Sequence, residues 1–307
     1  MDMAITILNQ LAIMLSFLVV GWLLTKTGKL KDDKPITVLI PNAIMPAMVV
    51  GALQAPYSLT LLRDIGIAAL GFFVVVAAGV VVGFLMGGLA RQPASATNTW
   101  TACIATTNSI FMALPIMLAL YGDGIMPLTA GIMLSFNLTT FLYINRLLEP
   151  ESKGKRGVNI KRLMLQPVIV AIFVGMILFL MPFRLPAPGR AVLDLLGMMA
   201  MPLSMVVIGS QLAKCNVRET FTDAKVYLVS AGRLIIAPLL SYFMMRPFIA
   251  DPVILGIVTI SAVMPVATIV AVIAVEQGGD VRFCSKVVFV STILCIFTVP
   301  ILLPLLL

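Results

Sequence analysis

Ten long runs of uncharged, mostly apolar residues alternate along the chain with short segments that hold nearly all of its charged residues; Arg233 alone interrupts a run. A membrane-spanning helix needs about 20 predominantly apolar residues, so each run can cross a bilayer. The runs are continuous, whereas the strands of a membrane barrel alternate every second residue. The pattern predicts an all-α polytopic membrane protein with transmembrane helices in residues 3–25, 35–62, 65–90, 92–122, 124–145, 163–183, 195–213, 226–245, 252–275 and 287–307.

Composition supports this class and narrows the chemistry. Of the 307 residues, 61% are hydrophobic and only 11% are charged, a balance that no water-soluble domain tolerates. The chain has no His, which excludes a Ser-His-Asp triad, a His-ligated zinc site and a His proton relay. Its four Cys form no CxxC pair. We therefore expect neither an enzyme nor a cofactor or metal site, and the net charge of +8 indicates no nucleic-acid partner because it lies in the connections.

The distribution of basic residues predicts the orientation. Sixteen Lys and Arg lie in the odd-numbered connections between the runs and four in the even-numbered ones. Cytoplasmic loops carry an excess of Lys and Arg, so the odd connections are expected in the cytoplasm and both termini outside. We expect a bacterial cytoplasmic (inner) membrane. The longest polar segment, 146–162, is then a mid-chain cytoplasmic loop between two five-helix halves, 1–145 and 163–307.

The two halves share landmarks that predict an internal repeat. Three landmarks of the first half have a counterpart in the second half, and the distances along the chain between successive landmarks are nearly equal in the two halves. The counterparts are Met-Pro at 45–46 and 201–202, Asn108 and Pro265, and Gly-Asp at 122–123 and 279–280. Five helices per half is an odd number, so the second half is expected upside down relative to the first. Inverted repeats are typical of secondary transporters, whose substrate site lies near the bilayer midplane where the repeats meet.

Two of the runs contain polar residues and a proline at matching places, which predicts broken helices at that midplane. The fourth run has Thr107 and Asn108 before Pro115, and the ninth has Pro265 before Thr268. Proline removes a backbone hydrogen bond, and the freed groups need partners in protein or in a cavity. We expect Pro115 and Pro265 to set a crossover of helices 4 and 9, and Asn108, Thr107 and Thr268 to bind substrate. Ordinary proline kinks are the alternative interpretation.

Two further residues have two interpretations each. Asn42 stands one helical turn before Pro46, where its side chain can bond freed backbone or reach the substrate. Arg233 is the only formal charge within a run, and it fits either an anchor that snorkels to the cytoplasmic interface or an anion contact. No run has Asp or Glu near its centre, which argues against a buried carboxylate as the main sodium or proton site.

Several segments resemble the auxin efflux carrier family, which includes bacterial malonate and malate permeases. Residues 42–46 resemble the family's Asn-x-x-x-Pro segment. Residues 108–123 are similar to its Asn-x-Gly-Phe-x-Gly-x-Pro…Tyr-Gly-Asp pattern, and residues 264–280 to Met-Pro-x-Ala-Thr-Asn…Tyr-Gly-x-Asp. The chain departs from these patterns at Ile110, Ala113 and Ile269, where the family has two glycines and an Asn. These departures bear on the substrate more than on the fold.

The resemblance implies two inverted five-helix repeats, crossed helices 4 and 9 around the substrate, homodimers through helices 2 and 7, and carboxylate-bearing substrates. The resulting hypothesis is a secondary active transporter that moves a small organic anion, such as malonate or malate, across the lipid bilayer by alternating access. The sequence has no ATP-binding motif, so a coupling ion, proton or sodium, or the substrate gradient would supply the energy. A passive anion channel and a carrier of a neutral or amphipathic solute are the alternatives.

Overall fold

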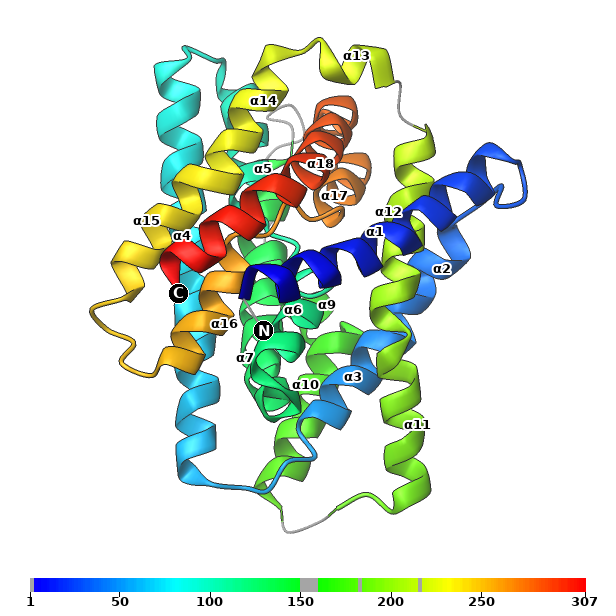
Figure 1. Cartoon of the computed structure of the whole chain (residues 1–307), viewed down its shortest axis with the longest axis vertical. Coiled ribbons are helices and arrows are strands. Elements are labelled where there is room, and N and C mark those ends of the chain that lie inside the picture. The colour runs from blue at the N-terminus through cyan, green and yellow to red at the C-terminus, as the bar shows by residue number, and fades with distance from the viewer. Residues whose placement is uncertain (1–2, 150–159, 182–183, 215–216) are drawn as a thin grey trace.

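A computed structural model describes residues 3–149, 160–181, 184–214 and 217–307. The regular secondary structure of this described part is entirely helical, and its only β-type pairing is one isolated antiparallel bridge between Thr107 and Val266. Most of the predicted cytoplasmic loop, residues 150–159, lies outside the described residues. The helices run mostly along the long axis of the molecule, with α1 (Met3–Lys26) and α18 (Val281–Leu306) crossing obliquely in front (Figure 1).

Seven helical segments of the described part are long and apolar enough to cross a membrane. They are α1, Lys34–Ala52, α4 (Leu59–Leu89), Asp123–Leu147, Ala187–Lys214, Ala224–Met245 and α18. The second segment contains α2 (Lys34–Leu39), η1 (Ile40–Ile44) and α3 (Met45–Ala52), and the fourth contains η2 (Asp123–Ile125), α7 (Met126–Thr139), η3 (Thr140–Ile144) and α8 (Asn145–Leu147). The next two contain α11 (Ala187–Met198), α12 (Ala200–Lys214), α14 (Ala224–Ala231), η5 (Gly232–Ile236) and α15 (Ala237–Met245).

The other three predicted spans are short or interrupted helices. The fourth run forms α5 (Ala94–Ala105) and α6 (Ala113–Tyr121), and the ninth forms α16 (Pro252–Ala262) and α17 (Ile269–Gln277). The sixth run forms only the 14-residue α10 (Pro167–Leu180), after the short α9 (Ile160–Met164). The structure therefore supports a polytopic helical membrane protein, whereas ten crossings in two inverted repeats stay a prediction.

Polarity is distributed as a bilayer requires. Large apolar side chains are exposed on the outer helices, for example Leu89, Phe243 and Leu305. Polar side chains gather inside, and the buried ones include Thr106, Thr107, Asn108, Ser109, Thr259 and Ser261 around the two helix breaks. Lipid tails solvate apolar surface and cannot satisfy backbone polar groups, so irregular backbone at membrane depth is tolerated only inside the protein. The breaks are placed accordingly.

The connections separate into two ends of the molecule. The turn after α4 and the short α13 (Val217–Phe221) lie at the upper end of Figure 1, whereas the connection from α3 to α4 lies at the lower end. At the upper end, Lys214 forms an ion pair with Asp33, and Arg282 pairs with Glu219. These pairs tie together connections that are basic in sequence, which makes the upper end the predicted cytoplasmic side.

Two glycines allow α1 and α12 to pack along each other at close range. A Cβ at Gly21 would collide with the backbone carbonyl of Val206, and a Cβ at Gly209 would collide with that of Leu18. In membranes, small residues let helix backbones approach because packing, and not water exclusion, drives their association. This contact fixes α12 beside the pocket described below.

We expect Gly209→Val to destabilise the protein, since the added side chain has no space between α1 and α12. Overpacking of this kind costs about 1–3 kcal/mol. The measurement is the thermal unfolding midpoint of the purified protein in detergent. Gly66→Val is the matched control because nothing lies within 4 Å of a Cβ at that position of α4, and an equal midpoint for both variants would contradict this account of the packing.

Candidate functional site

The two interrupted helices cross at their breaks and pair there through the backbone. Between α5 and α6 the chain is non-helical over residues 106–112, and between α16 and α17 over residues 263–268. The amide N of Asn108 donates to the carbonyl O of Pro265 over 2.8 Å, and the amide N of Ala267 donates to that of Thr106 over 3.1 Å. Thr107 and Val266 face each other between these two bonds. Each break therefore satisfies backbone groups of the other.

Side chains complete this pairing, which we call the crossover. The Thr107 hydroxyl donates to the carbonyl of Ser261 over 2.6 Å, and it is fully buried. The Ser291 hydroxyl of α18 accepts a hydrogen bond from the amide N of Val266 over 3.2 Å. Both bonds serve backbone groups that the breaks would otherwise leave unpaired in an apolar environment. Thr107 was predicted to bind substrate, but its hydroxyl group forms a hydrogen bond that stabilises the crossover.

The two predicted crossover prolines occupy different positions. Pro265 lies inside the second break and supplies the carbonyl that Asn108 bonds. Pro115 lies beyond the first break, as the third residue of α6. A proline in the first turn of a helix costs little, because the amide hydrogens there have no partner within the helix. The first break is therefore formed by residues 106–112, and Pro115 marks the start of the helix that follows.

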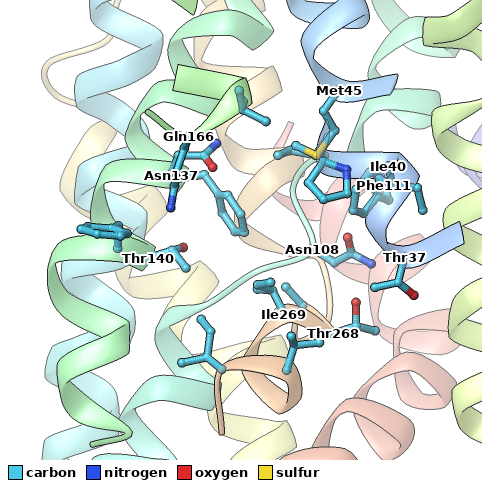
Figure 2. A pocket seen from close by; sticks show the side chains of 18 of the residues that line it. Thr37, Ile40, Met45, Asn108, Phe111, Asn137, Thr140, Gln166, Thr268 and Ile269 are labelled. Carbon is cyan, nitrogen blue, oxygen red and sulfur yellow. The ribbon is translucent and has the colours of Figure 1, made fainter. Parts of the chain in front are cut away.

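A cavity of about 700 Å³ lies against the crossover. Its walls come from the segment α2–η1–α3, the break after α5, the segment α7–η3–α8, the start of α10, the middle of α12, and α17. Figure 2 shows Asn108 and Thr268 projecting from the two breaks into this space, with Thr37 next to them and Asn137 and Thr140 on the opposite wall. The cavity thus brings together Asn42, Thr107, Asn108 and Thr268, four of the predicted site residues.

The side-chain amide of Asn108 is available to a ligand in the cavity. The residue is only 4% exposed, and its side-chain amide has no hydrogen-bond partner among the described residues. Thr268 is half-buried at the first position before α17, and its hydroxyl does not cap that helix. Asn42 is exposed to the cavity, and its Nδ2 donates to the carbonyl of Val38 over 2.7 Å. A buried amide without a partner is costly unless a ligand or water bonds it.

Three hydroxyl groups that sequence analysis did not single out also line the cavity. Those of Ser109, Thr140 and Ser204 are buried and have no hydrogen-bond partner among the described residues. Ser109 directly follows Asn108, which was a usable signal. Thr140 and Ser204 gave none, because a Ser or Thr within a membrane helix commonly bonds a carbonyl of its own helix. The Nδ2 of Asn137 donates to the Met133 carbonyl over 2.8 Å, and this residue lines the cavity.

Arg233 takes neither of its two expected positions. It is 0% exposed, so it does not snorkel to the interface, and it does not line the cavity. Its guanidinium lies behind the crossover and donates to the carbonyls of Ile104, Ala262 and Met264. The sequence could not indicate this position, because these partners lie 29 to 129 residues away along the chain.

Two of the three charged residues of the cavity, Arg146 and Glu276, are solvent-exposed, and we call the part of the cavity next to them its mouth. The charged lining residues are Arg146, Glu149 and Glu276, from α8, the turn after it and α17. The deep end next to the crossover is lined by amides, hydroxyls and apolar side chains, among them Phe111 and Ile269. Helix α17 begins directly after the second break and its first residue, Ile269, lines the cavity, whereas α6 begins at the far end of the first break, at Ala113; the first amide groups of a helix carry partial positive charge. The deep end therefore offers neutral hydrogen-bond donors together with the positive end of α17.

Comparison with known proteins agrees with this architecture. A family model described as "Membrane transport protein" matches residues 6–159 and 155–303. An "Uncharacterized transporter" of Methanothermobacter thermautotrophicus is 28% identical over 306 residues, which cover 96% of this chain and 95% of that protein. The family consists of membrane transporters and not of enzymes. The chain belongs to this auxin efflux carrier-like family of membrane transport proteins.

Proposed function

We propose that this protein is a secondary active transporter of a small organic anion, a malonate- or malate-like carboxylate, which it moves by alternating access. One observation carries the proposal: the side-chain amide of Asn108, which has no partner among the described residues, lines the cavity between two helix breaks that are followed by the N-termini of α6 and α17. Helix N-termini favour anions. In secondary transporters, discontinuous helices near the midplane direct such ends at the carboxylate of a substrate.

The residues have distinct roles in this proposal. Asn108 and Thr268 hydrogen-bond a substrate carboxylate from the two breaks, and Ser109 adds a buried hydroxyl beside them. Thr107 and Pro265 hold the crossover through their backbone partners. Asn42 belongs to the wall formed by α2, η1 and α3, and its side-chain amide is oriented by the Val38 carbonyl. The substrate is thus held by groups from both breaks, so movement of either break changes its environment.

The charges at the mouth support an access route from the predicted cytoplasmic side. Arg146, Glu149 and Glu276 follow or end helices at the basic, predicted cytoplasmic end of the molecule. In that orientation the cavity is open to the cytoplasm, and the route to the other side is closed by the crossover and the helices below it. Alternating access requires a second state in which this relation is reversed. A proton or sodium ion is the expected coupling ion.

A homodimer is part of the same proposal. No side chain of α11 is buried, and Val192, Leu195 and Met198 of this helix are all more than half exposed. The resemblance places a dimer contact on helices 2 and 7, and α11 forms the first part of helix 7. An apolar face of this kind is available to a second copy or to lipid.

A carrier of a neutral or amphipathic solute is the second candidate. It is favoured by the absence of any charged side chain among the described residues at the deep end of the cavity. Phe111, Phe136 and Phe141 line its walls, and Ile269 occupies the place of the family's Asn. A dianion would meet one basic residue, Arg146, near two acidic ones, whereas a solute with an apolar part would use the aromatic walls.

We expect Asn108→Ala to abolish concentrative uptake of labelled malonate or malate into proteoliposomes. Hydrogen bonds to charged groups are worth about 1.5–3 kcal/mol, or about tenfold to a hundredfold in affinity. The measurement is saturable uptake under imposed pH, sodium and voltage gradients. Asn98→Ala is the control, because Asn98 lies on α5 outside this cavity. Both variants must reach wild-type amounts in the membrane.

The outcomes separate the candidates. Saturable uptake that unlabelled acid competes, and that Asn108→Ala loses, supports the anion carrier, and the gradient that drives it identifies the coupling. Uptake that is unaffected by Asn108→Ala would remove this residue from the site. If no acid is taken up under any gradient but a labelled neutral amide of the same size is, the second candidate replaces the first.

Side-specific labelling tests the orientation. In a background with Cys215→Ser, we expect Asn145→Cys near the mouth of the cavity to react with an impermeant maleimide only from the cytoplasmic face. Tyr57→Cys, in the exposed connection between α3 and α4, should react only from outside. The remaining cysteines are buried and should stay unlabelled. The reverse pattern in right-side-out and inverted vesicles would show that the charge-based orientation is wrong.

A further inference from the structure

Arg233 is a buried charged residue that does not belong to the proposed substrate site. Of the Asp, Glu, Lys and Arg side chains whose burial the structure describes, only Arg233 and Asp33 are buried. Asp33 pairs with Lys214, whereas Arg233 forms no ion pair with a described carboxylate. An unpaired charge inside a membrane protein is expensive and marks a functional role by default. Something other than a carboxylate must therefore stabilise this guanidinium.

Its partners are the ends of two half-helices. Nη1 donates to the Ile104 carbonyl of α5 over 2.7 Å, Nη2 donates to the Ala262 carbonyl of α16, and Nε donates to the Met264 carbonyl over 3.2 Å. The last carbonyls of a helix lack partners within the helix and carry its partial negative charge. Two such negative ends meet at the crossover, and only Arg has a planar group with enough donors to bond both at once.

The four half-helices at the crossover thus differ in what compensates them. The negative ends of α5 and α16 are neutralised by Arg233 on the side away from the cavity. The positive ends of α6 and α17 have no side-chain cap. Without Arg233, the two negative ends would cancel the field of the two positive ones near Asn108, because helix-end charges are similar in size and opposite in sign.

We propose that Arg233 is a positioning residue, which fixes the crossover and neutralises the C-terminal ends of α5 and α16, so that the cavity side of the crossover attracts an anion. The second part rests on the proposed function. The first part does not, since it concerns geometry alone. A residue with only a packing role would affect stability but not the preference for an anion over a neutral molecule of the same shape.

The first experiment measures geometry without any substrate. Thr107 and Val266 lie opposite each other in an antiparallel bridge, and the hydrogen bonds are made by their neighbours and not between these two residues. In such a non-hydrogen-bonded pair the Cα atoms are about 4.5 Å apart. Cysteines at both positions should therefore cross-link rapidly with a mild oxidant, as read by mass spectrometry. We expect Arg233→Gln to slow this cross-linking at least fivefold and Arg233→Lys to slow it less. Unchanged cross-linking in both variants would overturn the positioning role.

The second experiment measures charge preference with malonate and its neutral diamide as probes. We expect Arg233→Gln to raise the KM for malonate at least tenfold and that for malonamide less than twofold, with Arg233→Lys restoring most of the difference. Thr107→Val removes a crossover bond without changing charge and should affect both probes equally. Arg246→Gln, at an exposed position after α15, is the control for net charge and should change neither.

The two experiments test the geometric part and the electrostatic part of the proposal separately. If the wild-type protein transports neither probe, the proposed function fails and the cross-linking result still decides the geometry. If cross-linking depends on Arg233 but both probes respond alike, the electrostatic part is wrong and the packing part stands. If Arg233→Gln does not fold, Arg233→Lys and Thr107→Val carry the comparison, and equal KM shifts for both probes in Arg233→Lys would overturn the charge effect.

Discussion

The pairing of the two helix breaks is the constraint on which the rest of this structure depends. Inside a bilayer every unpaired backbone group costs several kcal/mol, so a helix can be interrupted only where another part of the protein supplies the missing bonds. Here the breaks supply them to each other, through Asn108 with Pro265 and Ala267 with Thr106. Neither break is stable alone, which explains why interrupted segments occur at matching places in the two halves and why a cavity can exist beside them. The surrounding helices, above all α4, serve to hold α5 and α16 at this meeting point.

Three π-helical segments lie around the same region, and a proline follows two of them. η1 and η3 line the cavity, and η5 contains Arg233. Pro46 follows η1 and Pro238 follows η5 at the same spacing from the start of each segment. A proline cannot donate to the carbonyl four residues earlier, and a widened turn is one way to accommodate that loss. In η5 the widened turn lies where the guanidinium must reach two half-helices. The same local irregularity thus shapes a wall of the cavity and places the charge behind the crossover.

The sequence was sufficient to predict the class, the two interruptions and the gathering of Asn108, Thr268 and Asn42, because these follow from local hydropathy and from proline chemistry. It placed the first interruption at Pro115, which instead begins α6, since a proline breaks a helix and starts one equally well. It predicted a full span at 163–183, whereas α10 begins only at Pro167. The partners of Arg233 and the free hydroxyls of Thr140 and Ser204 depend on contacts between distant segments. No local pattern encodes such contacts.

Under the proposed function, the absence of a fixed charge at the deep end among the described residues suits what a carrier must do. Such a protein has to switch between its two access states with substrate bound. To complete a transport cycle, it then has to switch back either empty or with a different solute bound. A cationic side chain facing the closed, empty cavity would be desolvated on every return, at a cost of several kcal/mol. Helix ends and neutral amides impose a smaller penalty when empty, yet they still favour an anion when it is present. Under the proposed function, the position of Arg233 behind the crossover retains the effect of its charge, while its guanidinium is bonded to three backbone carbonyls and does not need a substrate as partner.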